Sequence, residues 1–203
     1  MKHLKLGVLV SGRGSNLQAI VDACEKKEIS ATVAVVISNV AHAFALERAK
    51  KHKIPSFCVA SETGWETKTI QILKEKQVDL ICLAGFMKRL PKIFIQEFGH
   101  KILNIHPSLL PAFPGLQAQK QALKHGVKIT GVTVHFVDEG IDSGPILLQA
   151  AVPVLENDTV ETLSARILEE EHKLYPQAIQ RMATESLKVA GRNVRSIRNK
   201  GES

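Results

Sequence analysis

Short apolar runs alternate with amphipathic segments along the first half of the chain. The runs have the length and the continuous apolar character of buried parallel strands. The segments between them carry apolar residues three and four positions apart, a spacing that predicts helices. The predicted strands span residues 6–10, 31–37, 56–59, 80–84 and 101–106, and the predicted helices span residues 15–27, 41–52, 65–76 and 92–98. This alternation predicts an α/β fold: a doubly wound, mostly parallel, Rossmann-like sheet flanked by helices.

The pattern changes after Pro111. A short helix is followed by two extended runs that a turn-like segment joins, and then by a long helix with Asp158 or Thr159 as its N-cap. The two extended runs either pair as a hairpin or extend the main sheet, and the pattern leaves both arrangements open. We therefore expect a C-terminal strand pair and a long helix. These elements span residues 117–125, 130–137, 145–154 and 159–183.

The chain has 203 residues, 44% of them hydrophobic, which suits one core. Because no repeat or linker divides it, we predict one domain over residues 1–187 and a basic tail over residues 188–203. The formal charge is +7, and the tail contains five Lys and Arg residues. A solvated, frayed tail is the simplest interpretation of that charge run.

Composition also limits the partners. No apolar stretch approaches the roughly 20 residues that a membrane-spanning helix needs. One Tyr, one Trp and seven Phe offer few rings for stacking on nucleic-acid bases. Three cysteines without metal-ligand spacing favour a reducing compartment. We expect a cytoplasmic monomer or weak homodimer that binds small molecules, not nucleic acid or a membrane. A nucleic-acid-binding module driven by the positive charge is the alternative from another class.

The end of the predicted strand 101–106 carries the most informative side chains. Asn104 and His106 are two positions apart, so on a strand they point to the same face. Pro107 ends the strand and keeps His106 extended. Ligands of open α/β sheets bind at the carboxyl ends of strands, and an amide beside an imidazole can stabilise an oxyanion while moving a proton. The plainer alternative is a loop-entry asparagine and a structural histidine.

A glycine-rich turn, S-G-R-G-S-N-L at residues 11–17, connects the first strand to the first helix. Gly14, Ser15 and Asn16 can present backbone N–H groups and a polar side chain to an anion at the helix start. Leu17 stands where a dinucleotide fingerprint has its third glycine, and no acidic residue closes the second strand. The turn therefore favours a single phosphate over a nicotinamide dinucleotide. An ordinary turn with a Ser or Asn helix cap is the alternative.

An acidic turn follows the predicted strand 130–137. It carries three carboxylates and two glycines, and Asp142 is our candidate for the carboxylate that pairs with His106 and raises the pKa of His106 by charge attraction. Solvated turn acids are the alternative, and the spacing does not match an EF-hand. Two further residues, His135 on the strand and Glu171 on the long helix, are more typical of structural positions.

The order of these motifs identifies a resemblance. The sequences S-G-R-G-S-N-L at 11–17, L-A-G-F-M at 83–87, N-I-H-P-S-L-L-P at 104–111 and D-E-G-I-D at 138–142 resemble the phosphoribosylglycinamide formyltransferases. The resemblance covers about residues 5–185. The Asn-x-His pair with a downstream Asp is shared by the wider folate-dependent formyltransferase family. The loop at 11–17 narrows the resemblance to the glycinamide ribonucleotide branch or to the formyltetrahydrofolate hydrolases. Resemblance to the first branch implies transfer of a formyl group from 10-formyltetrahydrofolate to the amine of glycinamide ribonucleotide in purine synthesis, without a metal.

The resemblance implies a role for each motif. Asn104 and His106 would stabilise the oxyanion, and Asp142 would hold His106 charged. The N-terminal half would bind the ribonucleotide phosphate through Gly14, Ser15 and Asn16, and Glu171 on the long helix would contact the ribose. The C-terminal half would mainly bind the folate, and the folate contacts would come from Asn104 and from Met87, Lys88, Arg89, Leu90, Asp138, Glu139, Gly140 and Ile141.

Three positions depart from the family pattern. Residues 62–66 contain no arginine, although relatives commonly have a basic residue there for the glutamate tail of the folate. Gln117 stands near a position that is often histidine, and Leu168 stands where relatives often have a polar residue. These departures concern the tail contacts and part of the ribose contact.

The runner-up function is that of a formyltetrahydrofolate hydrolase, which uses the same three catalytic residues with water as the nucleophile. Such relatives usually carry an additional N-terminal regulatory domain. Methionyl-tRNA formyltransferases need a C-terminal RNA-binding domain. From the extent of this chain we expect the ribonucleotide transferase instead.

Overall fold

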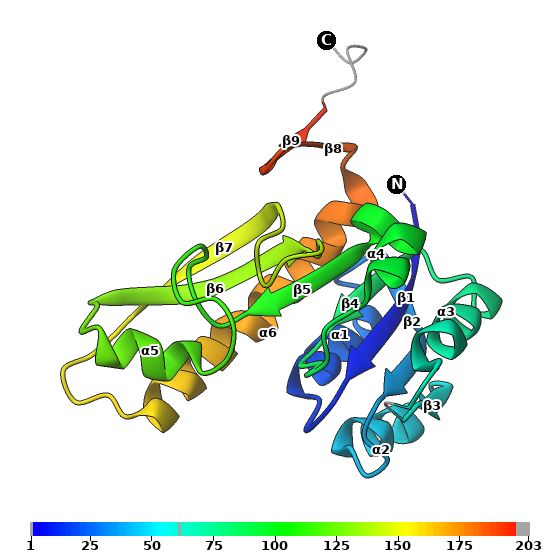
Figure 1. Ribbon diagram of the computed structural model, residues 1–203, viewed down its shortest axis with the longest axis horizontal. Helices are drawn as coiled ribbons and strands as arrows, with labels where there is room; N and C mark the ends of the chain where they lie inside the picture. Colours follow the sequence, from blue (N-terminus) through cyan, green and yellow to red (C-terminus); the bar gives the residue numbers. More distant parts are fainter. Residues whose placement is uncertain (1, 61, 198–203) are drawn as a thin grey trace.

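A seven-stranded sheet forms the centre of the computed structural model, which describes residues 2–60 and 62–197 (Figure 1). The strand order is β3-β2-β1-β4-β5-β6-β7. The strands are β1 (Leu4–Val10), β2 (Ala31–Ser38), β3 (Ser56–Cys58), β4 (Leu80–Leu83), β5 (Ile102–His106), β6 (Ile129–Phe136) and β7 (Ile146–Pro153). The helices are α1 (Ser15–Glu25), α2 (Phe44–Lys51), α3 (Trp65–Glu75), α4 (Lys92–Phe98), α5 (Ala118–Lys124) and α6 (Val160–Thr184), with a 3₁₀ turn at Gly99–Lys101.

The first five strands are parallel, as the alternation of strands and helices predicts. The strand order reverses between β1 and β4, and such a switch point is where open α/β sheets bind ligands. The sequence left open whether the last two predicted strands of the sheet pair as a hairpin or extend the main sheet, and in the structure they do both. β6 pairs antiparallel with β5 and so extends the sheet, and β7 pairs antiparallel with β6.

Helices cover both faces of the sheet, which divides the core into two clusters. The larger cluster joins α1, α2, α5 and α6 to one face, and the smaller joins α3 and α4 to the other. Neighbouring strand residues alternate between them: Ile81 belongs to the smaller cluster and Cys82 to the larger. The sheet is therefore doubly wound, as predicted.

The long helix α6 holds two strand ends together. It begins at a capping box in which Thr159 accepts a hydrogen bond from the backbone N–H of Thr162. Further along, the fully buried Tyr175 hydroxyl is 3.1 Å from the Leu83 carbonyl oxygen and 3.0 Å from that of Leu103. These bonds tie β4 to β5 beside the strand ends where Asn104 and His106 lie.

The expectation of a frayed tail is wrong for the residues that the structure describes. β8 (Leu187–Ala190) and β9 (Asn193–Ser196) pair as an antiparallel hairpin near one end of the molecule (Figure 1). Leu187, Val189 and Val194 pack against the larger core cluster, so the hairpin has an apolar face to bury. In the sequence, the many Lys and Arg residues of this segment drew attention away from its alternating apolar and polar positions. The predicted boundary at 187/188 falls inside β8, and Arg198 and Lys200 lie outside the described residues.

Within residues 2–60 and 62–197, no helix has both the length and the apolar composition needed to cross a membrane.

Candidate active site

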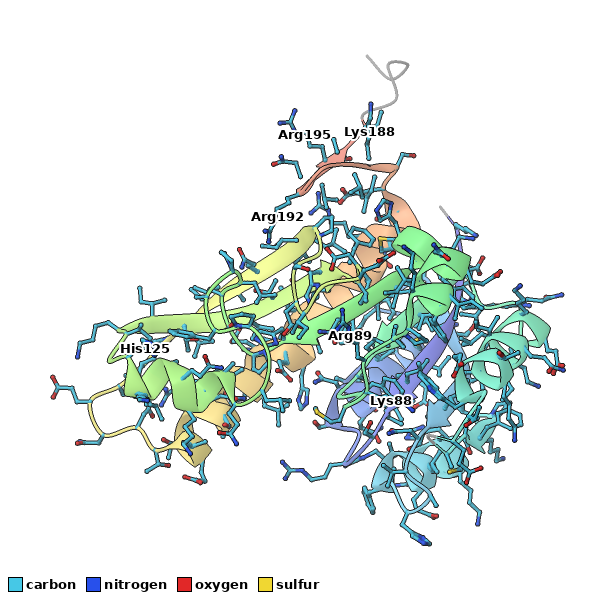
Figure 2. The ribbon with its side chains drawn as sticks, in the orientation of Figure 1. Lys88, Arg89, His125, Lys188, Arg192 and Arg195 are labelled. Carbon is cyan, nitrogen blue, oxygen red and sulfur yellow. The ribbon has the colours of Figure 1, made fainter. Side chains whose placement is uncertain are left out.

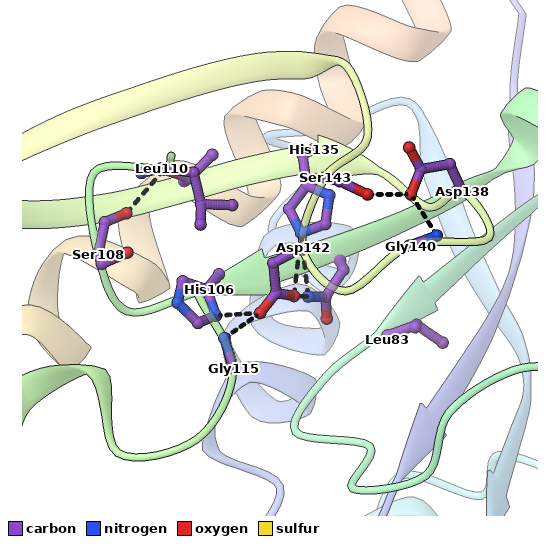
Figure 3. Close-up of polar contacts among 12 residues, drawn as sticks. Leu83, His106, Ser108, Leu110, Gly115, His135, Asp138, Gly140, Asp142 and Ser143 are labelled. Carbon is purple, nitrogen blue, oxygen red and sulfur yellow. Dashed lines mark hydrogen bonds and ion pairs between the residues drawn. The ribbon is translucent and has the colours of Figure 1, made fainter. Parts of the chain in front are cut away.

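The structure brings Asn104, His106 and Asp142 together at the carboxyl end of β5 (Figure 3). Asn104 and His106 are two positions apart on this strand, as the sequence requires. The loop between β6 and β7 places the Asp142 carboxylate between them. Its Oδ2 lies 3.2 Å from His106 Nδ1, and its Oδ1 accepts a hydrogen bond from Asn104 Nδ2 at 3.4 Å. One carboxylate therefore bridges the amide and the imidazole.

Asp142 is held by its own backbone and by a second loop. Its φ of 50° lies in the left-handed region, an uncommon conformation for a residue other than glycine that aspartate tolerates better than most. Its Oδ2 accepts a hydrogen bond of 2.8 Å from the backbone N–H of Gly115, which belongs to the segment before α5. Gly115 and Asp142 are far apart in the sequence, so the sequence could not show that they are in contact.

His135 joins this group, although its sequence position is typical of a structural histidine. β6 pairs His135 opposite Asn104, and His135 Nε2 lies 3.1 Å from Asn104 Nδ2. The same ring nitrogen is 3.7 Å from Asp142 Oδ1. Alternation along β6 correctly places His135 and Thr133 on one face, but only the register between β5 and β6 shows what that face meets.

His106 is enclosed by two acceptors. Its Nε2 is 2.8 Å from the Phe113 carbonyl oxygen, and its Nδ1 faces Asp142, so only a doubly protonated ring can donate to both. Burial opposes that charge, and the side chain is 6% exposed. Burial lowers the pKa of His106 and outweighs the attraction of Asp142, which acts to raise it. Asp142 therefore acts on this pKa in the predicted direction, but burial leaves the pKa of His106 below its ordinary value.

Asp142 itself stays ionised. Burial alone raises the pKa of a carboxyl group, but hydrogen bonds from His135 and Gly115 and the nearby His106 together lower the pKa of Asp142 below its ordinary value. The carboxylate opposes the burial that lowers the pKa of His106, so a proton that reaches the ring has a charged partner beside it. The cluster can therefore take up a proton and return it.

The glycine-rich loop leads directly into the N-terminus of α1. Gly14 is the N-cap, with φ 72°, and among the described side chains none hydrogen-bonds to this cap. A Cβ at Gly14 would lie 2.6 Å from the Ala45 Cβ, so only glycine fits here. Arg48 Nε donates to the Arg13 carbonyl at 2.9 Å and braces the loop from α2. The result is a helix N-terminus with the polarity to bind an anion, and the Ser or Asn cap left open by the sequence is not formed.

Two residues from opposite ends of the chain meet beside this loop. Asn16 Nδ2 donates a hydrogen bond of 2.7 Å to Glu171 Oε2 on α6, and both side chains are buried. Within the part of the chain that the structure describes, Asn16 Oδ1 has no hydrogen-bond partner. Burial raises the pKa of Glu171, which the Asn16 hydrogen bond only partly opposes. The resemblance assigns both residues to substrate binding, and the structure adds that they form one pair.

The loops after β1 and β4 meet at the switch point of the sheet. The backbone N–H of Ser11 donates to the Gly85 carbonyl at 3.1 Å, and the Met87 backbone N–H donates to Ser11 Oγ at 2.8 Å. The Met87 side chain is 71% exposed, whereas Leu90 is buried. Lys88 Nζ lies 4.3 Å above the centre of the Trp65 ring. A cation thus lies beside residues 62–66, although it comes from a different loop than in the family pattern.

The acidic turn is ordered by its own side chains. Asp138 Oδ1 accepts hydrogen bonds from the Gly140 backbone N–H at 3.0 Å and from Ser143 Oγ at 2.7 Å. The solvated-acid alternative therefore does not describe Asp138 or Asp142. Across residues 2–60 and 62–197, this turn included, no group of three or more His, Cys, Asp and Glu side chains is arranged to hold a metal ion.

A family model described as formyl transferase matches residues 4–179. The chain is 43% identical to a phosphoribosylglycinamide formyltransferase of Bacillus subtilis, over 88% of this chain and 94% of the relative. It superposes with a TM-score of 0.93 on glycinamide ribonucleotide transformylase 1 from Symbiobacterium toebii, at 52% identity, covering 96% of this chain and 94% of that one.

A structure of another kind is also similar. A formyltetrahydrofolate deformylase from Pseudomonas syringae superposes with a TM-score of 0.88 at 27% identity, covering 95% of this chain and 66% of that one. The chain spans 19% of the length of the bovine trifunctional purine biosynthetic protein adenosine-3, with 44% identity over 93% of its own length. The matched model covers most of the chain and includes every element from β1 into α6, so the chain belongs to the formyl transferase family.

Proposed function

We propose that this protein transfers a formyl group from 10-formyltetrahydrofolate to the amine of 5-phosphoribosylglycinamide, a step of de novo purine (IMP) biosynthesis in the cytoplasm. The observation that carries the proposal is the Asp142 carboxylate bridging Asn104 and His106 at the carboxyl end of β5. The relatives from Bacillus subtilis and Symbiobacterium toebii, which are named for this activity, support the choice of substrate.

The proposed chemistry is direct attack by the substrate amine. The amine nitrogen bonds to the formyl carbon, and charge develops on the formyl oxygen. The Asn104 amide N–H and protonated His106 stabilise this charge. The bond between the formyl carbon and N10 of the folate then breaks, N10 gains one proton, and the amine loses one. His106 moves this proton while Asp142 stabilises the imidazolium, so the reaction requires no covalent enzyme intermediate.

The substrate would lie across the switch point. The backbone N–H groups of Gly14 and Ser15 at the start of α1 would bind its phosphate. Asn16, beside these groups, would help to bind the phosphate, and its unpartnered Oδ1 can also accept a hydrogen bond from a substrate hydroxyl. Glu171 would contact the ribose. This places the substrate amine toward β5, where the reacting carbon must be.

The formyl donor would lie between the β4–α4 connection and the β6–β7 loop. Exposed Met87 and Ile141 supply apolar surface to a flat ring. Backbone groups of Lys88 to Leu90 and of Asp138 to Gly140 supply hydrogen bonds. Lys88, above Trp65, is the cation available to the glutamate tail.

The test follows consumption of 10-formyltetrahydrofolate by the purified protein, with and without 5-phosphoribosylglycinamide. We expect loss of the formyl donor only when the ribonucleotide is present, with one formylated product formed for each donor consumed. Equal loss without the ribonucleotide would assign the runner-up, a formyltetrahydrofolate hydrolase, which the similarity to the Pseudomonas syringae deformylase keeps as the alternative. No loss under either condition would exclude both.

A further inference from the structure

Two cationic side chains, one in the β4–α4 connection and one at the start of α4, contact the β6–β7 loop. The region proposed for the formyl donor lies between these two parts of the chain. The Arg89 guanidinium donates a hydrogen bond from Nη2 to the backbone carbonyl of Glu139. Lys92 Nζ, at the start of α4, lies 3.3 Å from Glu139 Oε1. Glu139 comes three residues before Asp142 in the β6–β7 loop. We call Arg89, Lys92 and Glu139 the clasp; Arg89 is labelled in Figure 2, and the loop that it contacts is drawn in Figure 3.

The clasp crosses a hollow of about 370 Å³. The hollow is lined by Arg89, Leu90, Pro91, Lys92, Ile95 and Glu139. The two cations and the carboxylate of the clasp are exposed, with side-chain exposures of 65% for Lys92 and 56% for Glu139. The loop is therefore tied to α4 by polar groups across open space, and such contacts are sensitive to substitution and to salt.

The β6–β7 loop has a second anchor of different character. Asp142 is 15% exposed and is bound by the Gly115 N–H and by His106, so this end of the loop belongs to the buried cluster. Gly140 and Ile141 lie between the two anchors, and Ile141 is 63% exposed. A glycine and a solvated apolar side chain contribute little packing of their own. Their conformation in the free protein therefore depends on the anchors to either side, together with the hydrogen bond that the Gly140 N–H donates to Asp138 Oδ1.

We infer that Arg89 and Lys92 are positioning residues, which act through Glu139 to pre-organise the loop segment 139–141 before the formyl donor binds. The inference rests on the proposed function, because it assigns that segment to the donor. A segment that is already ordered loses less conformational entropy on binding. Breaking the clasp should therefore raise KM for the donor, while kcat changes little because Asp142 keeps its own anchor.

The test compares Arg89→Met and Lys92→Met with a matched control, Lys74→Met. Lys74 forms an ion pair of similar exposure with Glu97, 2.6 Å away and outside the site. We expect Arg89→Met to raise KM for 10-formyltetrahydrofolate about threefold to tenfold and Lys92→Met by less, since an exposed ion pair contributes less than a charged hydrogen bond. Amide hydrogen exchange at residues 139–141 should accelerate in Arg89→Met without ligand. The control should change neither quantity.

A second set of measurements separates the clasp from a direct contact with the donor. Glu139→Gln keeps the backbone carbonyl that Arg89 uses but removes the ion pair, so adding Lys92→Met to it should have no further effect. The rise in KM should be the same for a donor that lacks the glutamate tail. A rise confined to the donor with a tail, or unchanged exchange in Arg89→Met, would overturn the clasp. Because hydrogen exchange needs no turnover, it tests the clasp even if the proposed reaction is wrong.

Discussion

The two ends of the candidate site differ in how their polar groups are satisfied. At the β5 end, Asp142 receives hydrogen bonds or ion pairs from Asn104, His106 and the Gly115 N–H, and it stays ionised. At the α1 end, within the described residues, Asn16 Oδ1 has no partner, and burial raises the pKa of Glu171. At the β5 end the polar groups are paired with one another, whereas at the α1 end a buried acceptor among the described residues has no hydrogen-bond partner.

This difference separates two requirements of a bimolecular transfer. Groups that stabilise a transition state work best when they are already oriented, because reorientation during the reaction raises the barrier. Groups that bind a polar substrate need free capacity, because each substrate hydroxyl or phosphate must exchange its water for a protein partner. The β5 end is therefore expected to control kcat, and the α1 end is expected to control KM for the ribonucleotide.

The largest expected effect is that of His106→Ala. Removal of the proton-transfer group should lower kcat by about 10³-fold, within the range for general acid–base catalysis, and should leave KM for the ribonucleotide nearly unchanged. Steady-state kinetics with each substrate varied in turn would measure both constants. His3→Ala, which changes an exposed histidine near the N-terminus, is the matched control. A variant that keeps wild-type kcat would remove His106 from the mechanism.

Asp142→Asn should follow, with kcat lowered by about 10²-fold. The carboxylate acts to raise the pKa of His106 against burial, so its loss should move the His106 limb of the pH–rate profile to lower pH. The folded-state pKa of Asp142 is lowered, so its stabilisation is present above the unfolded pKa and disappears as pH falls through the folded one. Thermal unfolding of parent and variant should therefore converge in acid. An unshifted pH–rate profile would contradict the pairing.

Glu171→Gln should act on binding. Gln keeps an oxygen for Asn16 Nδ2 but not the charge, and we expect KM for the ribonucleotide to rise about tenfold at nearly constant kcat. The folded-state pKa of Glu171 is raised, so ionising this carboxyl lowers the stability of the parent as pH rises above about 4.3, the unfolded value. The variant lacks that loss, so its melting temperature should gain on the parent between acid and neutral pH. A fall in kcat alone would remove the distinction between the two ends.

The smallest expected effect lies outside both ends. Thr159→Ala removes the N-cap of α6 and should cost about 1 kcal/mol, or about 2–4 °C in melting temperature for a chain of this size. Both kinetic constants should be unchanged at temperatures well below unfolding. Differential scanning calorimetry and steady-state assays would check this. A kinetic change would mean that general loss of stability also perturbs the site, and the other variants would then need correction for it.

Local sequence patterns determined most of the elements and the chemistry of the site. The α4 range matches its predicted residues, and the predicted β5 range differs by one residue, because apolar runs and a proline mark these boundaries. Asn104 and His106 share a face because of the two-residue period of a strand, and the glycine-rich turn at residues 11–17 leads into a helix as predicted. These properties depend on neighbouring residues, so the sequence alone reveals them.

Tertiary structure decided what depends on distant segments meeting. The register between β5 and β6 brings His135 to Asn104, and packing of α6 on α1 pairs Glu171 with Asn16. The balance of burial and charge at His106 could not be read from the chain, because it depends on how much protein surrounds the ring. The C-terminal hairpin was missed for a related reason: its apolar side chains matter only where a core exists to cover them. Sequence therefore determined which groups are present, and only the fold decided their partners and their charge.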